Sequence, residues 1–123
     1  MKNKKLINSF KYAFKGIGSS LKSEQNVKIH FAMMVLVIIA GILLNISMWE
    51  WIICFILFGL VISLEMVNTA IEIVVDMVSP EYNLKAGHVK DIAAGAVLVN
   101  AIVAFIVGLL IFLPKIIRLF IKF

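Results

Sequence analysis

Three long runs without a charged residue constrain the fold of this chain more than any other feature. The sequence has no Asp, Glu, Lys or Arg between Lys28 and Glu50, between Glu50 and Glu65, or between Asp91 and Lys115. Hydrophobic residues make up 63% of the 123 positions, above the content of about 45–50% that is usual in soluble domains. Long uncharged runs cross a bilayer as helices. We therefore expect an all-α integral membrane protein with a single domain.

The middle uncharged run is too short to cross the membrane alone. Residues 51–64 form about 21 Å of helix, whereas the hydrocarbon core is about 30 Å thick. The second helix must therefore continue past Glu65, which places Glu65 just inside one membrane interface. We expect an N-terminal region over residues 1–28, followed by membrane helices over residues 29–49, 51–76 and 91–114.

A polar stripe runs along the second of these helices. At about 100° per residue, its members fall within a sector about 100° wide, and most apolar side chains point elsewhere. Ionisable groups that face lipid are costly, so the stripe must face protein, water or a ligand. A functional site is therefore the default interpretation. The polar stripe consists of Glu65, Asn68, Thr69, Glu72 and Asp76.

The distribution of lysines predicts the orientation in the membrane. Seven lysines precede the first span, and Lys85 and Lys90 follow the second, whereas residues 45–50 between the first two spans contain none. By the positive-inside rule, the N-terminus and the 80–90 loop are cytoplasmic and the C-terminus lies outside. Most acidic residues then gather at the cytoplasmic side. We expect membrane lipids around the chain and no nucleic-acid partner.

The N-terminal region has the pattern of an amphipathic surface helix. Its apolar residues recur at spacings of three to four, and its lysines lie largely on the other side. The segment lacks a continuous apolar core and an obvious small-residue cleavage site, so we do not expect a cleaved signal peptide. The apolar residues concerned are Leu6, Ile7, Phe10, Phe14, Ile17 and Leu21.

Carboxylates at a membrane interface suit a metal ion that is bound together with a phosphate. Mg²⁺ takes oxygen ligands and is usually held by one or two carboxylates plus substrate phosphates. Lys90 and Asp91 are expected at the start of the third membrane helix, where backbone N–H groups and a lysine can meet a phosphate. Asp91 is more simply explained there as a helix N-cap. The sequence contains neither a P-loop nor a protein-kinase glycine loop, so the pattern alone does not name a substrate.

A longer motif narrows this interpretation. The string Glu65-x-x-Asn68-Thr69-Ala70-Ile71-Glu72-x-x-x-Asp76, followed by Lys90-Asp91, resembles the signature of the small prokaryotic diacylglycerol kinase and undecaprenol kinase family. Tyr12, Lys15-Gly16 and Glu24 are similar to the N-terminal part of that family, and Glu81-Tyr82 to its cytoplasmic loop. The resemblance extends over most of the chain.

This resemblance implies a homotrimer of three-span protomers in the bacterial cytoplasmic membrane, which phosphorylates a lipid alcohol with MgATP. By the same resemblance, Glu65 is the catalytic base, and Glu24 and Glu72 are the ligands of Mg²⁺. Asn68 and Asp76 are expected to order the site. The nucleotide-binding set of the family corresponds to Lys5, Tyr12, Glu24, Glu72, Glu81, Tyr82, Asn83, Lys90 and Asp91.

The identity of the lipid rests on fewer residues than the reaction does. The pattern Glu24-x-Asn26-x-x-x-His30 resembles the undecaprenol kinase branch, so we expect undecaprenol as the acceptor and diacylglycerol as the alternative. Both lipids present a hydroxyl group at the membrane surface. His30 and Asn100 are expected to be hydrogen-bond partners between helices and not ligands.

Two other classes of protein are compatible with parts of the pattern. A small oligomeric ion-coupled transporter or channel would use Glu65 as a protonatable gate. A purely structural membrane subunit would need none of the polar stripe. Neither class explains why Glu24, Glu72, Asp76 and the Lys90-Asp91 pair gather at one aqueous side. Residue by residue, simpler roles stay open: a structural acid for Glu65, a solvated charge for Glu24, and interface anchors for Tyr12 and Tyr82.

Overall fold

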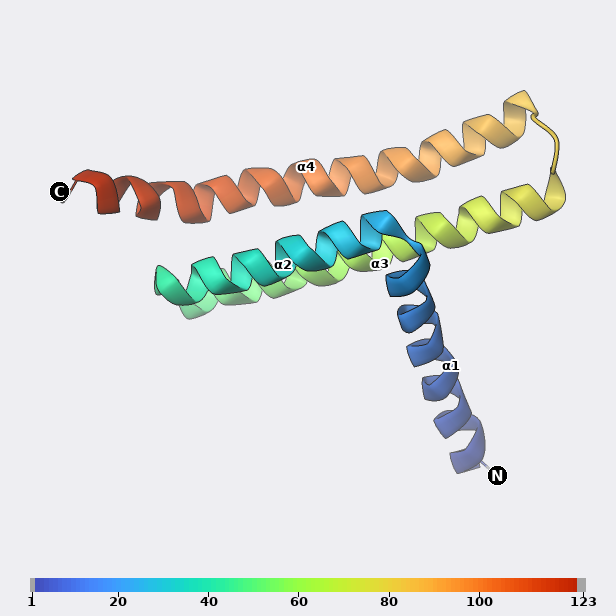
Figure 1. Ribbon diagram of the computed structural model, residues 1–123, viewed down its shortest axis with the longest axis horizontal. Helices are drawn as coiled ribbons and strands as arrows, with labels where there is room; N and C mark the ends of the chain where they lie inside the picture. Colours follow the sequence, from blue (N-terminus) through green and yellow to red (C-terminus); the bar gives the residue numbers. More distant parts are fainter. Residues whose placement is uncertain (1, 122–123) are drawn as a thin grey trace.

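The computed structural model describes residues 2–121, and all regular structure in that range is α-helical (Figure 1). The helices are α1 (Lys2–Ser23), α2 (Gln25–Leu43), α3 (Met48–Val78) and α4 (Leu84–Ile121). Helices α2, α3 and α4 are each long and apolar enough to cross a membrane. The prediction of an all-α protein with three membrane helices is therefore confirmed, whereas the homotrimer stays a prediction.

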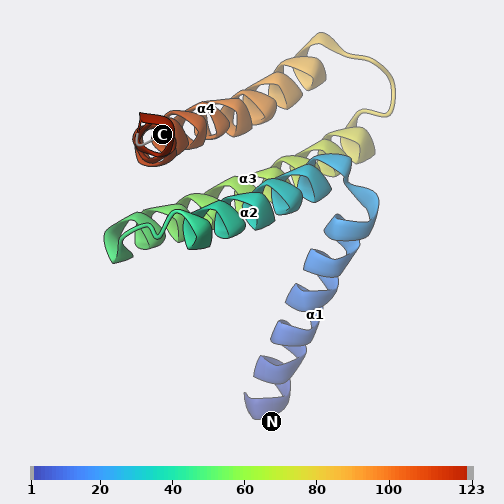
Figure 2. The ribbon, with the colours of Figure 1, turned by 60° about the vertical axis from the view of Figure 1, so that its left-hand side comes forward.

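Helix α3 is the central element of the bundle, because both α2 and α4 pack against it. Figures 1 and 2 show these three helices running side by side, while α1 leaves the bundle at the start of α2 and points away from it. Many large apolar side chains of the three helices are exposed, among them Leu36, Leu98 and Phe105. An apolar exterior of this kind suits lipid, which solvates such side chains.

The turn between α2 and α3 explains why the first predicted span is shifted. The prediction extended this span to Trp49, but α2 ends at Leu43 and Asn45 adopts a left-handed backbone conformation with φ of 53°. Asparagine tolerates this conformation better than most residues. Ser47 and Glu50 then form a capping box, in which each side chain accepts a hydrogen bond from the other residue's backbone N–H. Helix α3 therefore begins at Met48.

The third predicted membrane helix begins earlier than expected. Oδ1 of Asn83 accepts a hydrogen bond of 2.8 Å from the backbone N–H of Lys85, so Asn83 caps α4. Lys90 and Asp91 consequently lie inside the helix, where their backbone N–H groups belong to the helical ladder. The prediction that they stand at the helix start, with Asp91 as the N-cap, is wrong. Helix α4 also continues to Ile121, past the predicted end at residue 114.

Ion pairs join α3 and α4 near both ends. Nζ of Lys90 contacts Oδ1 of Asp76 near the 79–83 loop. At the opposite end, Nζ of Lys115 lies 2.9 Å from Oε2 of Glu50. These pairs show the antiparallel register of the two helices.

A small apolar cluster joins α2, the beginning of α3 and the later part of α4. Ile46, Cys54 and Ile111 are buried there, with Trp51 packed around them. A Cβ atom added at Gly41 would lie 2.7 Å from Cη2 of the Trp51 indole, which is too close for a real contact. Glycine at this position therefore permits the close approach of α2 and α3.

The junction between α1 and α2 lies at Glu24, four residues before the predicted boundary. Glu24 has an extended backbone with φ of −101° and ψ of 114°, so the chain changes direction there.

Figure 1 shows that α3 and α4 continue beyond the start of α2 to the 79–83 loop. The apolar side chains of α1, including Leu6, Phe10 and Phe14, are exposed.

Candidate functional site

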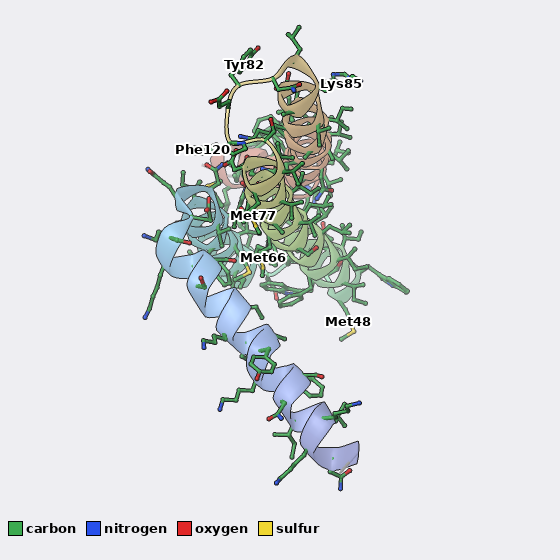
Figure 3. The ribbon with its side chains drawn as sticks, turned by 90° about the vertical axis from the view of Figure 1, so that its right-hand side faces the viewer. Met48, Met66, Met77, Tyr82, Lys85 and Phe120 are labelled. Carbon is green, nitrogen blue, oxygen red and sulfur yellow. The ribbon has the colours of Figure 1, made fainter. Side chains whose placement is uncertain are left out.

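Glu65 is a buried carboxylic acid near the middle of helix α3. Its exposed fraction is 3%, although it belongs to a helix that is long and apolar enough to span the bilayer. Nε2 of His30, on α2, lies 3.7 Å from Oε2 of Glu65. Figure 3 shows the position of the next residue, Met66, between Met48 and Met77 along α3. The structure therefore brings a residue from a second helix to the predicted catalytic base.

The next turns of α3 continue the polar stripe. Nδ2 of Asn68 donates a hydrogen bond of 3.1 Å to Oε1 of Glu72, and the hydroxyl of Thr69 donates to the backbone carbonyl of Glu65 at 3.1 Å. Asn68 is only 7% exposed, and its Oδ1 atom has no hydrogen-bond partner among residues 2–121. Asn68 thus holds one oxygen of the predicted metal ligand Glu72 in place.

Charged residues lie closer to the 79–83 loop. The predicted supporting residue Asp76 and the predicted nucleotide-binding residue Lys90 are paired with each other. Both side chains are substantially exposed, so the pair adds at most about 1 kcal/mol to stability. The pair can therefore separate at small cost.

The 79–83 loop presents three of the predicted nucleotide-binding residues. Glu81 and Tyr82 are exposed, and Tyr82 projects outward from the loop (Figure 3). Asn83 uses its side chain to cap α4. Ser79 donates a hydrogen bond to the backbone carbonyl of Glu81 at 3.1 Å, which restrains the loop.

The remaining predicted residues are not gathered around this loop within one chain. Lys5 and Tyr12 are exposed on α1, which points away from the loop in Figures 1 and 2. Glu24 stands at the junction of α1 and α2, and its side chain makes no capping hydrogen bond. Across the described residues, no group of three or more His, Cys, Asp or Glu side chains is placed to hold a metal ion. The carboxylates of Glu24 and Glu72 are nevertheless the kind of oxygen donor that Mg²⁺ takes.

An apolar cavity beside Glu65 was not predicted from the sequence. It has a volume of about 490 Å³ and lies between α2, α3 and α4, where His30, Met34, Cys54, Phe58, Ala104 and Ile111 contribute to its lining. His30 therefore touches both this cavity and the buried carboxylate. Small residues at a spacing of three to four on α4, Ala101, Ala104 and Gly108, were the available signal, because they leave room between helices.

These features belong to a multi-pass membrane protein with an acidic site at the polar end of its bundle. Comparison with known proteins assigns the chain more closely, because residues 11–112 match the family model described as prokaryotic diacylglycerol kinase. The chain belongs to this family and is a lipid kinase. The resemblance inferred from the motifs is therefore confirmed, and the transporter and structural-subunit alternatives lose their support.

Individual relatives differ in the lipid that their names specify. The chain is 46% identical over 107 residues to an undecaprenol kinase of Bacillus subtilis, covering 87% of each protein. It is 40% identical over 115 residues to a diacylglycerol kinase of Synechocystis, covering 93% of this chain and 66% of the relative. It is 28% identical over 102 residues to a diacylglycerol kinase of Escherichia coli K12, covering 83% and 84% of the two proteins.

Proposed function

We propose that this kinase transfers the γ-phosphate of MgATP to the hydroxyl group of undecaprenol and so produces undecaprenyl phosphate. The observation that carries the proposal is the position of Glu65, a buried carboxylate beside an apolar cavity and a few turns from an exposed charged cluster. A lipid alcohol and a soluble nucleotide can meet at such a place. The 46% identity to an undecaprenol kinase supports this lipid over diacylglycerol, which is the alternative acceptor.

In the proposed reaction, Glu65 accepts the proton of the lipid hydroxyl while the hydroxyl oxygen attacks the γ-phosphorus. The new O–P bond forms as the bond between the γ-phosphorus and the bridging oxygen of ADP breaks. ADP leaves, and Glu65 returns its proton to water. Phosphoryl transfer depends mostly on positioning and charge stabilisation, so the fixed location of Glu65 matters as much as its basicity.

Glu24 and Glu72 are proposed to hold Mg²⁺ when the nucleotide is bound. Asn68 supports this role because its hydrogen bond orients one oxygen of Glu72. The ion would neutralise charge on the phosphates, as it does in other phosphoryl-transfer enzymes.

The nucleotide is proposed to lie between the 79–83 loop and the charged face of α4. Lys90 would contact the phosphates, and Asp91, Glu81, Tyr82 and Asn83 would complete this part of the site. Lys5 and Tyr12 belong to the same proposed set, but α1 of the same chain points away from the loop. Contact between these two groups requires a neighbouring protomer, which is consistent with the proposed homotrimer.

The proposed orientation places the N-terminus and the 79–83 loop in the cytoplasm of a bacterial cell. The lysine distribution supports it by the positive-inside rule. Helix α1 would then lie on the cytoplasmic surface of the membrane, with Leu6, Phe10 and Phe14 inserted among the lipids. Such a position agrees with α1 leaving the bundle where α2 begins.

Phosphorylation of defined lipids tests the proposal. The purified chain is reconstituted in lipid and given γ-labelled ATP, MgCl₂ and either undecaprenol or diacylglycerol. We expect label in undecaprenyl phosphate, and a lower kcat/KM for diacylglycerol in a direct competition. Preferential labelling of diacylglycerol would support the alternative acceptor, and labelling of neither lipid would reject both assignments.

A further inference from the structure

Asn100 on α4 lies at the same depth in the bundle as Glu65 on α3. Counting from the ion pair near the loop, Asn100 is ten residues from Lys90 and Glu65 is eleven from Asp76. Counting from the other end, Asn100 is fifteen residues from Lys115 and Glu65 is fifteen from Glu50. Because both helices rise about 1.5 Å per residue, the two counts place the side chains in one layer.

Asn100 lies on the inward face of α4, and its Nδ2 atom is without a hydrogen-bond partner in the part of the chain that the structure describes. Ala93, Val97, Asn100 and Ala104 are not exposed and recur every three to four residues, which places them on one inward face of α4. Nδ2 of Asn100 is buried and has no hydrogen-bond partner within residues 2–121. A buried donor without a partner is rare and costly, so the position calls for a partner that binds there.

The layer contains polar groups from all three membrane helices. His30 of α2 contacts Glu65 of α3, and Asn100 of α4 lies at their level. Oδ1 of Asn68, about 4.5 Å further along α3 by helical rise, is also buried without a partner in the described part of the chain. A hydroxyl group suits such surroundings, because it can donate one hydrogen bond and accept others.

The apolar cavity ends at this layer. Its lining includes His30, Ile62 and Ala101, which directly follows Asn100, and it extends away from the loop to Cys54 and Ile111. An occupant with a long apolar tail and one terminal hydroxyl group would match the apolar cavity with its tail and the polar layer with its hydroxyl group. Glu65 and Asn100 do not line the cavity themselves, but His30 does and lies 3.7 Å from the proposed base, so the substrate lipid is the occupant that we assign to it.

We propose that Asn100 is a substrate-binding residue that donates a hydrogen bond from Nδ2 to the hydroxyl oxygen of the lipid alcohol, whose tail occupies the cavity between α2, α3 and α4. This inference rests on the proposed kinase reaction. The donated hydrogen bond turns the hydroxyl so that its proton points to Glu65. Asn100 therefore acts on the acceptor lipid and not on the nucleotide.

Two substitutions test the two halves of this proposal in the reconstituted full-length chain. Asn100→Leu removes the donor and keeps the number and branching of the side-chain heavy atoms, and Ala104→Phe fills the cavity. Ala96→Phe, at an exposed position of the same helix that does not line the cavity, is the matched control. The assays measure KM and kcat with undecaprenol, KM for ATP, and the release of labelled phosphate when water is the only acceptor.

We expect Asn100→Leu to lower kcat/KM for undecaprenol by about tenfold, as the loss of one buried hydrogen bond would do. Ala104→Phe should raise KM for the lipid, and Ala96→Phe should not. KM for ATP and the release of phosphate to water should stay within about twofold of the wild type, because neither uses the cavity. A loss that is confined to the lipid kinetics, with the ATP kinetics unchanged, separates a contact with the lipid from a general structural role.

The proposal is overturned if Asn100→Leu leaves the lipid kinetics unchanged, or if it lowers transfer to lipid and to water equally. The second result would mean that Asn100 bonds to Asn68 or to a second copy of the chain. If Asn100→Leu does not yield folded protein, Asn100→Ser is judged by the same criteria. A wild-type chain that labels neither lipid rejects the kinase reaction itself, which distinguishes the two failures.

Discussion

Nε2 of His30 lies 3.7 Å from Oε2 of Glu65, which links α2 to the buried acid at the centre of α3. The carboxylate side chain is 4% exposed, and the imidazole is 24% exposed and also lines the apolar cavity. His30 therefore stands between the space assigned to the lipid and the proposed base. At 3.7 Å the two groups are polar neighbours beyond hydrogen-bond distance, and we expect His30 to help orient the carboxylate.

Replacing Glu65 with Gln should lower kcat by about 100-fold, the lower part of the range for loss of a general base. Positioning and charge stabilisation carry much of phosphoryl transfer, so a larger loss is not expected. ATP binding should persist, because Glu65 is proposed to contact the lipid hydroxyl group and not the nucleotide. Label transfer and equilibrium binding of ATP measure the two effects. Glu50→Gln, at the opposite end of α3, is the matched control and should keep turnover close to wild type.

Replacing His30 with Leu should lower kcat by about tenfold, because Glu65 loses the polar neighbour that orients it. His30→Gln keeps a hydrogen-bonding group in a similar position and should restore most of the activity. Initial rates at saturating ATP and undecaprenol give this comparison. Equal losses in the Leu and Gln variants would contradict an orienting role.

Replacing Lys90 with Ala should raise KM for ATP by about tenfold or more, because a charge-assisted contact to phosphate is lost. The thermal stability of the protein should change little, since the exposed pair with Asp76 contributes at most about 1 kcal/mol. Lys85→Ala removes a lysine of the same helix and serves as the comparison. If both variants raise KM equally, net positive charge and not the position of Lys90 would be responsible.

Replacing Glu72 with Gln should increase the Mg²⁺ concentration that gives half-maximal activity by about tenfold. An amide is a poorer ligand than a carboxylate for this ion, which prefers charged oxygen donors. The measurement is a titration with MgCl₂ at fixed free ATP. A Mg²⁺ requirement identical to that of the wild type would remove Glu72 from the proposed ligand set.

Replacing Gly41 with Ala should destabilise the fold by about 1–3 kcal/mol, which is typical when a methyl group is forced into a packed contact. The new Cβ atom would lie 2.7 Å from the Trp51 ring, so the ring or α2 must move. Gly59→Ala provides the control, because a Cβ atom at Gly59 meets nothing within 4 Å. Thermal unfolding in detergent should show a lower midpoint for the Gly41 variant alone.

The ends of the helices show how local signals compete in a membrane sequence. The lack of charge placed the first span at residues 29–49, although Ser47 and Glu50 already have the spacing of a capping box. Asn83 similarly caps α4 well before the uncharged run begins. Hydrophobicity indicates which part of a helix lies in lipid, whereas capping residues decide where the helix begins. The edge of the membrane span and the first residue of the helix therefore fall at different positions, because they have different physical causes.

The candidate site contains contacts within one helix and contacts between helices, and only the first kind follows from the local sequence. The hydrogen bond from Asn68 to Glu72 joins residues four apart, so it follows from helical periodicity alone. The pairs Asp76–Lys90 and Glu50–Lys115 depend on the register of α3 and α4. No property of either helix alone specifies that register.

The amino-acid sequence by itself determined the helical class, the three membrane spans and the polar stripe on α3. Apolarity and the 3.6-residue period are properties of one segment, and the bilayer compels such a segment to form a helix. The tertiary structure decided that His30 reaches Glu65, that Asn100 shares its depth, and that a cavity lies beside them. Such contacts depend on how helices are rotated and shifted against one another, and side-chain packing at places such as Gly41 and Trp51 sets that arrangement.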